Sequence, residues 1–252
     1  MVARNELVAY CNQLLDSEAF ADYCPNGLQV EGRDSVHKIV SGVTASQALV
    51  DAAIAADADL LLVHHGYFWK GEPAAVVGSK QRRLKALLGH ELNLLAYHLP
   101  LDVHAEVGNN TQLARLMGWQ ISGGLEPGNP RSVGLHGELL HACSGAELAL
   151  QLDQVLERSP LHIAGHDRPI KRIAWCTGAA QGYIDKAIAL GVDAFVSGEI
   201  SEPTVHAARE NGIDYFAAGH HATERYGVRA LGEHLAERFG LQHVFIDIDN
   251  PV

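Results

Sequence analysis

The stretch LLLVHHGYFWKG, residues 60–71, decides the fold, because an apolar run of strand length ends in two adjacent histidines and a glycine. Four apolar residues without polar alternation predict a strand that is buried on both faces, as in a parallel sheet covered by helices. Sheets of this kind carry their chemistry at the carboxyl ends of the strands. His64 and His65 are therefore candidate functional residues, although an isolated pair also fits one packed and one solvated histidine.

The segments that precede this strand predict a β-α-β unit. Residues 38–43 (KIVSGV) have the composition of a second strand, and residues 47–56 that of an alanine-rich helix that begins after Ser46. The chain is therefore expected to belong to the α/β class, with parallel or mixed sheets.

A weak internal repeat extends this interpretation to the second half of the chain. Residues 39–66 align without gaps on residues 173–200, and in this register Asp59 meets Asp193. Two alanine-rich β-α-β units can also align by composition alone. The next strand in each half makes chance a poorer explanation, because both strands are followed by a histidine and, four residues later, a carboxylate.

The repeat predicts two related α/β lobes, residues 1–115 and 170–252, that form one compact unit with a metal site between them at the strand ends. Residues 116–169 contain a glycine- and proline-rich stretch and a helical segment, residues 146–156, and are expected to be a variable connection.

Composition bounds the class of protein. The chain has 252 residues, 47% of them hydrophobic, which can supply a substantial core. Its four cysteines show no CxxC spacing, so a disulfide framework or zinc ribbon is not indicated and a cytoplasmic location is expected. The sequence shows no signal peptide and no apolar run long enough for a membrane span. A net charge of −11 argues against nucleic acid as a partner.

The residues at the strand ends suggest metal-ligand chemistry. They are imidazoles and carboxylates, which suit zinc, iron, manganese or nickel. Five or more ligands from separate segments are too many for one tetrahedral ion and favour two ions in a hydrolytic site. The chain shows no GxSxG, GxxxxGK[ST] or GxGxxG motif, so other hydrolase and nucleotide-binding classes are not indicated. The candidate set is His64, His65, His98, Asp102, Glu199, His220, His221 and Glu224.

Several motifs together resemble one known family, and the resemblance covers nearly the whole chain. They are PNGLQVEG at 25–32, VHHGYFWKG at 63–71, HLPLD at 98–102, GNN at 108–110, SGEISEPTVHAARE at 197–210 and GHHATERYG at 219–227. The chain is similar to the YbgI-type dinuclear-metal-centre proteins, also called GTP cyclohydrolase 1 type 2 homologues. This family is related to the yeast Ngg-interacting-factor family. The sequence resembles the short form, without the inserted domain of longer members.

The resemblance implies two divalent metal ions per subunit, held by His64, His65, Asp102, His220 and Glu224. It leaves His98, Glu199, His221 and Glu202 as orienting or acid–base candidates, with His98 and Glu199 the catalytic candidates.

The resemblance also implies a ring-shaped homohexamer and a metal-dependent hydrolase that acts on a nucleotide or related small molecule. The reaction is less constrained than the site, since two-metal centres also serve phosphoesters and amides. The alternative is a metal-binding scaffold or regulatory protein without turnover.

Overall fold

A computed structural model describes all 252 residues and divides the chain into two compact units. Unit 1 comprises residues 1–108 and 227–249, and unit 2 comprises residues 109–226 and 250–252. Helix α9 (His220–Phe239) begins in unit 2 and ends in unit 1.

Unit 1 is a three-layer α/β/α structure around a five-stranded sheet in the order β13-β4-β5-β6-β2. The first four of these strands are parallel, and β2 is antiparallel to β6. Strands β1 and β3 form a separate antiparallel pair. The elements of unit 1 are β1 (Val2–Ala3), α1 (Arg4–Leu14), the 3₁₀ helix η1 (Ser17–Ala19), β2 (Gly27–Val30), β3 (Ser35–Val36), β4 (Lys38–Thr44), α2 (Gln47–Ala55), β5 (Leu60–His65), α3 (Gly78–Gly89), β6 (Asn93–Ala96), α4 (Leu99–Val103) and β13 (Gln242–Phe245).

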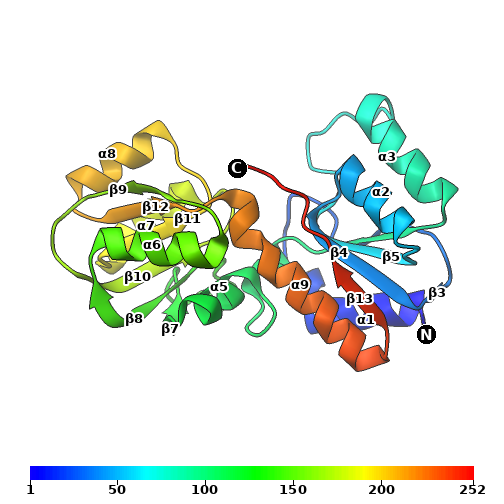
Figure 1. Cartoon of the computed structure of the whole chain (residues 1–252), viewed down its shortest axis with the longest axis horizontal. Helices are drawn as coiled ribbons and strands as arrows, with labels where there is room; N and C mark the ends of the chain where they lie inside the picture. Colours follow the sequence, from blue (N-terminus) through cyan, green and yellow to red (C-terminus); the bar gives the residue numbers. More distant parts are fainter. The chain divides into compact units, whose positions relative to one another are not determined.

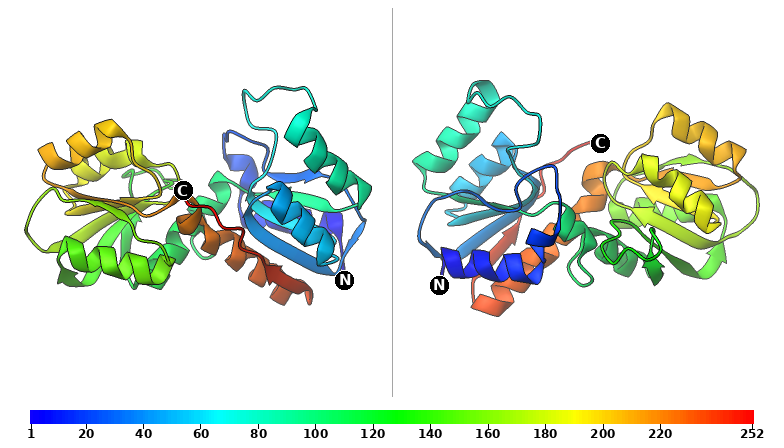
Figure 2. Two further views of the ribbon diagram at one scale, coloured as in Figure 1. Left: turned by 45° about the horizontal axis from the view of Figure 1, so that its top comes forward. Right: turned by 180° about the vertical axis from the view of Figure 1, so that it is seen from behind.

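The surroundings of strand β5 explain why apolar and polar residues do not alternate in its sequence. Leu60 and Leu62 pack on one face of the sheet with α1 and α9, and Leu61 and Val63 pack on the other with α2 and α3. All four side chains are fully buried. Figure 1 shows the helices on the two faces of this sheet, and Figure 2 shows the same layers from two further directions.

Unit 2 repeats this architecture on a six-stranded mixed sheet in the order β7-β8-β10-β11-β12-β9, in which β10, β11 and β12 are parallel. Trp175 and Phe216 pack with α5 and α6, whereas Phe195 and Tyr215 pack with α7 and α8 on the opposite face. The elements of unit 2, before α9, are α5 (Asn109–Met117), β7 (Gln120–Gly124), β8 (Leu135–Cys143), α6 (Gly145–Leu156), β9 (Leu161–Ile163), β10 (Ile170–Cys176), the 3₁₀ helix η2 (Gln181–Tyr183), α7 (Ile184–Leu190), β11 (Ala194–Ser197), α8 (Glu202–Glu210) and β12 (Asp214–Ala217).

The structural equivalence of the two units extends to single side chains. The Asp59 carboxylate accepts hydrogen bonds from two backbone amides near the start of β4, at 2.8 and 3.0 Å. The Asp193 carboxylate does the same near the start of β10, also at 2.8 and 3.0 Å. Matched carboxylates that fix matched strands show that the sequence repeat reflects a repeated β-α-β structure.

The units differ from the expected lobes 1–115 and 170–252. Residues 116–169 do not form a separate connection, because β7, β8 and β9 pair within the sheet of unit 2 and α6 covers it. The C-terminal part of α9 and strand β13 belong to unit 1, where β13 pairs with β4. Both differences arise from pairings between residues far apart in sequence.

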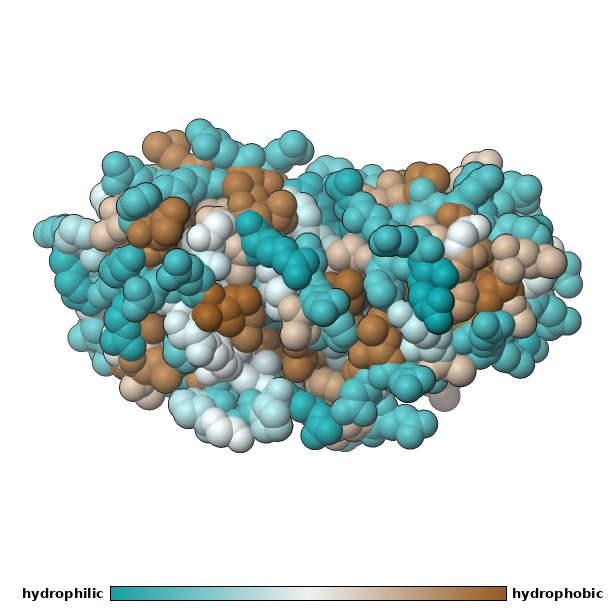
Figure 3. Space-filling view, turned by 90° about the horizontal axis from the view of Figure 1, so that it is seen from below, coloured by the Kyte–Doolittle hydropathy of each residue, from teal (hydrophilic) through white to brown (hydrophobic).

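The exposed apolar side chains are scattered over several elements, among them Leu88 of α3, Leu140 of β8 and Leu150 of α6. On the face drawn in Figure 3, hydrophobic residues occur in small groups among hydrophilic ones. Scattered side chains of this kind need no partner to explain them. None of the helices combines the length and apolar character needed to cross a membrane.

Candidate metal centre

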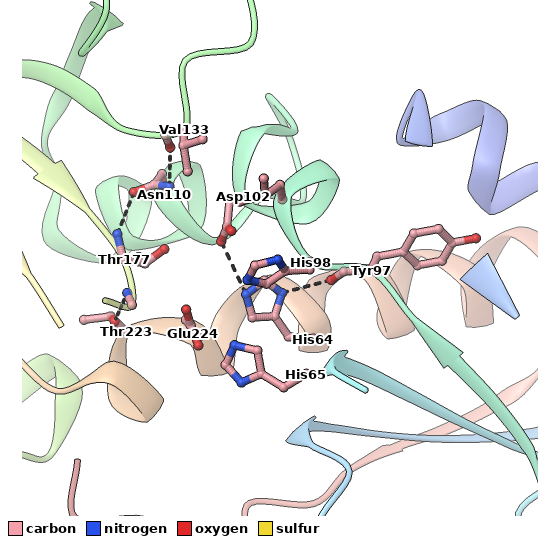
Figure 4. A network of polar contacts seen from close by, with 12 residues as sticks. His64, His65, Tyr97, His98, Asp102, Asn110, Val133, Thr177, Thr223 and Glu224 are labelled. Carbon is pink, nitrogen blue, oxygen red and sulfur yellow. Dashed lines mark hydrogen bonds and ion pairs between the residues drawn. The ribbon is translucent and has the colours of Figure 1, made fainter. Parts of the chain in front are cut away.

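His64 lies at the carboxyl end of β5 and is fully buried. Its Nδ1 is 2.9 Å from the carbonyl oxygen of Tyr97, as Figure 4 shows. Because a carbonyl oxygen only accepts, Nδ1 must carry the proton, and in the neutral ring the lone pair then lies on Nε2. Nε2 lies 3.6 Å from Oδ1 of Asp102.

His65 follows in the same strand, and its ring centroid lies 4.6 Å from that of His64. Its Nδ1 is 3.1 Å from the hydroxyl oxygen of Thr44 at the end of β4. Gly66 then allows close packing, because a Cβ there would overlap the side chains of Gln29 and Ala96. The end of β5 therefore brings both imidazoles close together, and Gly66 lets the backbone after them pack against Gln29 and Ala96.

Asp102 approaches His64 from the short helix α4. Pro100 lies in the first turn of this helix, where a backbone N–H would have no acceptor within the helix, so the proline is tolerated. The Asp102 side chain is 7% exposed. His98 precedes this helix, and a nitrogen of each of His64, His65 and His98 lies within 4.8 Å of the other two. Unit 1 therefore gathers three imidazoles and one carboxylate from β5 and the segment after β6.

In unit 2, His220 and Glu224 lie one turn apart at the start of α9. The helix begins at His220, and this places the pair on one face with Nε2 of His220 3.2 Å from Oε2 of Glu224. The other ring nitrogen, Nδ1, lies 2.7 Å from Oε1 of Glu199. Unit 2 thus gathers one imidazole between two carboxylates.

The charge of the His220 ring follows from these neighbours. Burial alone lowers the pKa of His220, but hydrogen bonds and charge from Glu224 and Glu199 outweigh burial and raise the pKa to about 9. The same two carboxylates that retain a proton on the ring would also attract a metal cation.

The segment between the strand and the histidine is one residue longer after β12 in unit 2 than after β6 in unit 1. The matching bonds are Tyr97 N to Val63 O, at 3.1 Å, and Ala218 N to Ser197 O, at 2.7 Å. His98 follows Tyr97 by one residue, whereas His220 follows Ala218 by two. The two His-xxx-carboxylate motifs are therefore similar in sequence without being equivalent in position.

The remaining candidates lie in different surroundings. Glu202, at the start of α8, is exposed and pairs with His206 at 2.9 Å, so it forms part of a surface ion pair. The backbone amide of His221 donates to the carbonyl of Val252 at 2.9 Å. Glu199, by contrast, contacts His220 directly.

Two groups that sequence reasoning missed position the candidate ligands. Asp22 contacts His98, with its carboxylate 2.7 Å from Nδ1. Gly178 has φ +69°, and a Cβ there would overlap Oε1 of Glu224. An aspartate just before the turn-forming CPNG segment was the sequence signal for the first, while nothing in the sequence pointed to the second.

A cavity of about 560 Å³ opens beside Asp22 in unit 1. Its volume lies within the range of small-molecule sites. Polar and aromatic side chains line it, including Asn12, Phe20, Asn26, Phe68 and Lys70.

The chain is similar over nearly its whole length to known proteins, and the matches also span nearly the whole length of those proteins. A profile described as Duf34/NIF3 (NGG1p interacting factor 3) matches residues 2–251. The chain is 62% identical over 250 residues to a Pseudomonas aeruginosa protein named GTP cyclohydrolase 1 type 2 homolog, covering 99% of each. It also matches the solved structure of protein ybgI, described as of unknown function, with TM-score 0.96, 50% identity and full coverage of both chains. The structure of TTHA1606 from Thermus thermophilus matches with TM-score 0.90 and 35% identity, again over both full chains.

Proposed function

Since the chain belongs to the Duf34/NIF3 family, we propose that it is a dinuclear metal-dependent hydrolase. The proposed ligands are His64, His65, Asp102, His220 and Glu224. The observation that carries the proposal recurs in both units: Nε2 of an imidazole faces a carboxylate oxygen, at 3.6 Å in unit 1 and 3.2 Å in unit 2.

A positive charge between an imidazole nitrogen and a carboxylate oxygen at such distances is stabilising, and a proton or a divalent cation can supply it. In unit 1, the bond from Nδ1 of His64 to the carbonyl of Tyr97 leaves the lone pair of the neutral ring on Nε2, the nitrogen that can bind a cation. In unit 2, Glu199 lies against Nδ1 of His220, and a metal ion at Nε2 would replace the proton that the pKa of about 9 keeps on this ring in the absence of metal. Two ligand atoms that each lie about 2.1 Å from a tetrahedral zinc ion are roughly 3.4 Å apart, so the donor pairs fit a divalent cation.

The donor set also limits the kind of ion. Imidazole and carboxylate without thiolate suit zinc, iron, manganese or nickel. Ions held there would polarise a substrate oxygen and lower the pKa of a bound water, which is the chemistry that hydrolysis requires. The protein's own part is orientation: the Tyr97 carbonyl and the Glu199 carboxylate hold the distal protons of the two imidazoles and so direct each Nε2.

We propose a nucleotide or related small molecule as the substrate. The name of the P. aeruginosa relative supports a guanine nucleotide, and the cavity beside Asp22 supports a compound of that size. We further propose a cytoplasmic homohexamer. Four free cysteines in the chain support the reducing location, and the ring assembly rests on the family resemblance.

The test is hydrolysis by protein stripped with chelator and reloaded with Zn²⁺, Mn²⁺, Fe²⁺ or Ni²⁺. GTP and bis(4-nitrophenyl) phosphate serve as probes, with the Glu224→Gln variant and unloaded protein as controls. Metal-dependent turnover that is lost in the variant supports the proposal. Metal binding without turnover of either probe, or of a wider nucleotide and phosphoester panel, would replace the hydrolase with a metal-binding scaffold.

A further inference from the structure

Asp22 is a buried carboxylate that contacts His98 from the segment after η1. Its side chain is 2% exposed, and Oδ1 lies 2.7 Å from Nδ1 of His98. Oδ1 also accepts from the backbone amide of Tyr23 at 2.6 Å. Oδ2 accepts from the backbone amide of Leu99 at 3.0 Å and from Nδ2 of Asn26 at 2.9 Å.

Besides the imidazole, two backbone amides and the side-chain amide of Asn26 donate to this carboxylate, so the site favours the ionised form. Burial alone raises the pKa of Asp22, but the hydrogen bonds from His98 and Asn26 outweigh it and bring the pKa down to about 2. An ionised carboxylate can only accept hydrogen bonds. Nδ1 of His98 must therefore carry a proton, which leaves the lone pair of the neutral ring on Nε2.

The surroundings also fix the orientation of the His98 ring. Its backbone amide donates to Oδ1 of Asn26 at 2.8 Å, and the ring meets Trp69 edge-on with centroids 5.1 Å apart. The ring centroids of His64 and His65 lie 5.1 and 5.7 Å away. Since Asp22 occupies Nδ1, the nitrogen directed at this histidine pair is Nε2.

Asp22, Cys24 and His98 also lie close enough to suggest a metal site of their own. The hydrogen bonds of Asp22 argue against that role, because both of its carboxylate oxygens already accept two hydrogen bonds each.

We propose that Asp22 is a positioning residue that holds His98 as the Nδ1–H tautomer, with Nε2 presented as a hydrogen-bond acceptor beside His64 and His65. Nε2 can then accept a hydrogen bond or a proton from a reactant bound near these two histidines. The catalytic consequence rests on the proposed hydrolase, whereas the tautomer depends only on the contacts of unit 1.

The tautomer is measured directly by ¹⁵N NMR of the imidazoles in metal-free, full-length protein, with His98→Gln used to assign the signal. We expect Nδ1 of His98 to give the protonated, pyrrole-type shift and Nε2 the unprotonated, pyridine-type shift. The opposite tautomer in the wild-type protein overturns the proposal, whether or not the protein proves to be a hydrolase.

Asp22→Asn supplies the perturbation, because an amide must place its NH₂ against N–H donors at one of the two oxygen positions. We expect the His98 tautomer to become mixed or reversed. Asp59→Asn is the matched control, since Asp59 also binds two backbone amides and a side chain in unit 1 without touching His98. The control should lose stability and keep the wild-type His98 signals. Wild-type His98 signals in Asp22→Asn would overturn the proposal.

Kinetics on the Zn²⁺- or Mn²⁺-loaded protein add a second readout. With bis(4-nitrophenyl) phosphate, Asp22→Asn should lower kcat by about 10–100-fold, with a smaller effect on KM and unchanged metal content. In a His98→Ala background the same substitution should have no further effect on kcat. An equal loss in both backgrounds would show that Asp22 does not act through His98. If no probe is turned over, the hydrolase fails while the NMR result still decides the position of the proton.

Discussion

Gly178→Ala should displace the carboxylate of Glu224, a proposed metal ligand, without changing the chemical identity of that residue. Gly178 has φ +69°, and a Cβ at this position would overlap Oε1 of Glu224. The overlapped atom is the end of a flexible side chain, so the carboxylate can retreat by roughly 1 Å to reach van der Waals separation. That retreat alters its 3.2 Å approach to Nε2 of His220.

The magnitude has two parts that a control separates. Alanine in a left-handed conformation costs about 1–2 kcal/mol, which corresponds to a fall in Tm of about 2–8 °C for a chain of this size. Gly191, at the end of α7, has φ +64° and its nearest neighbour would be 3.8 Å from an added Cβ, so Gly191→Ala carries the same backbone cost without the overlap. Only Gly178→Ala should weaken metal binding, by at least about tenfold or about 1.4 kcal/mol.

The assay is competition of each metal-free variant with a chromophoric chelator for Zn²⁺, alongside thermal unfolding without metal. We expect similar losses in Tm for both alanine variants and a weaker Zn²⁺ affinity for Gly178→Ala alone. Wild-type Zn²⁺ affinity in Gly178→Ala, at a Tm loss equal to that of Gly191→Ala, would refute the assignment of Glu224 as a ligand.

Three further predictions concern the metal centre, the fold of unit 2 and the assembly. Glu224→Gln should lower metal content and abolish turnover of bis(4-nitrophenyl) phosphate, while His98→Ala should keep most of the metal and lower the rate; full activity in Glu224→Gln would contradict the ligand assignment. The Asp193 carboxylate has its pKa held below the ordinary 3.8, since hydrogen bonds from the backbone amides of Arg172 and Lys171 outweigh burial, so its stabilisation is present above that pH and is lost as pH falls below it. Asp193→Asn should therefore cost about 1–3 kcal/mol in urea unfolding at neutral pH and show a flatter acid dependence than the wild type, and an unchanged acid dependence would count against this role. Light scattering of the wild-type protein at micromolar concentration should give a closed homo-oligomer, and a monomer would contradict the proposed hexamer.

The sequence predicted those parts of the structure that local pattern determines. The run from Leu60 to Val63 is apolar because helices cover both faces of β5, and this burial is legible in the residues themselves. The repeat could be read because Asp59 and Asp193 each fix the start of a strand, a role that demands the same residue in both copies. The i, i+4 spacing of His220 and Glu224 similarly survives in the helix that begins there.

Long-range pairing could not be read in the same way. Residues 116–169 contain turn-forming glycines and prolines, yet their strands enter a sheet whose other members come later in the chain. Strand β13 pairs with β4 across some two hundred residues, and no local signal specifies that choice. The role of Asp22 was hidden for the same reason, because its partner His98 is 76 residues away in sequence.

The most direct test of the central claim is the metal content of the protein. Elemental analysis of protein purified without chelator, or dialysed against each candidate divalent ion and then freed of excess, should give about two ions per chain. That content should fall as pH drops below about 6.5, where histidines become protonated. Reproducible stoichiometry near zero under metal-replete conditions at neutral pH would contradict the dinuclear metal centre.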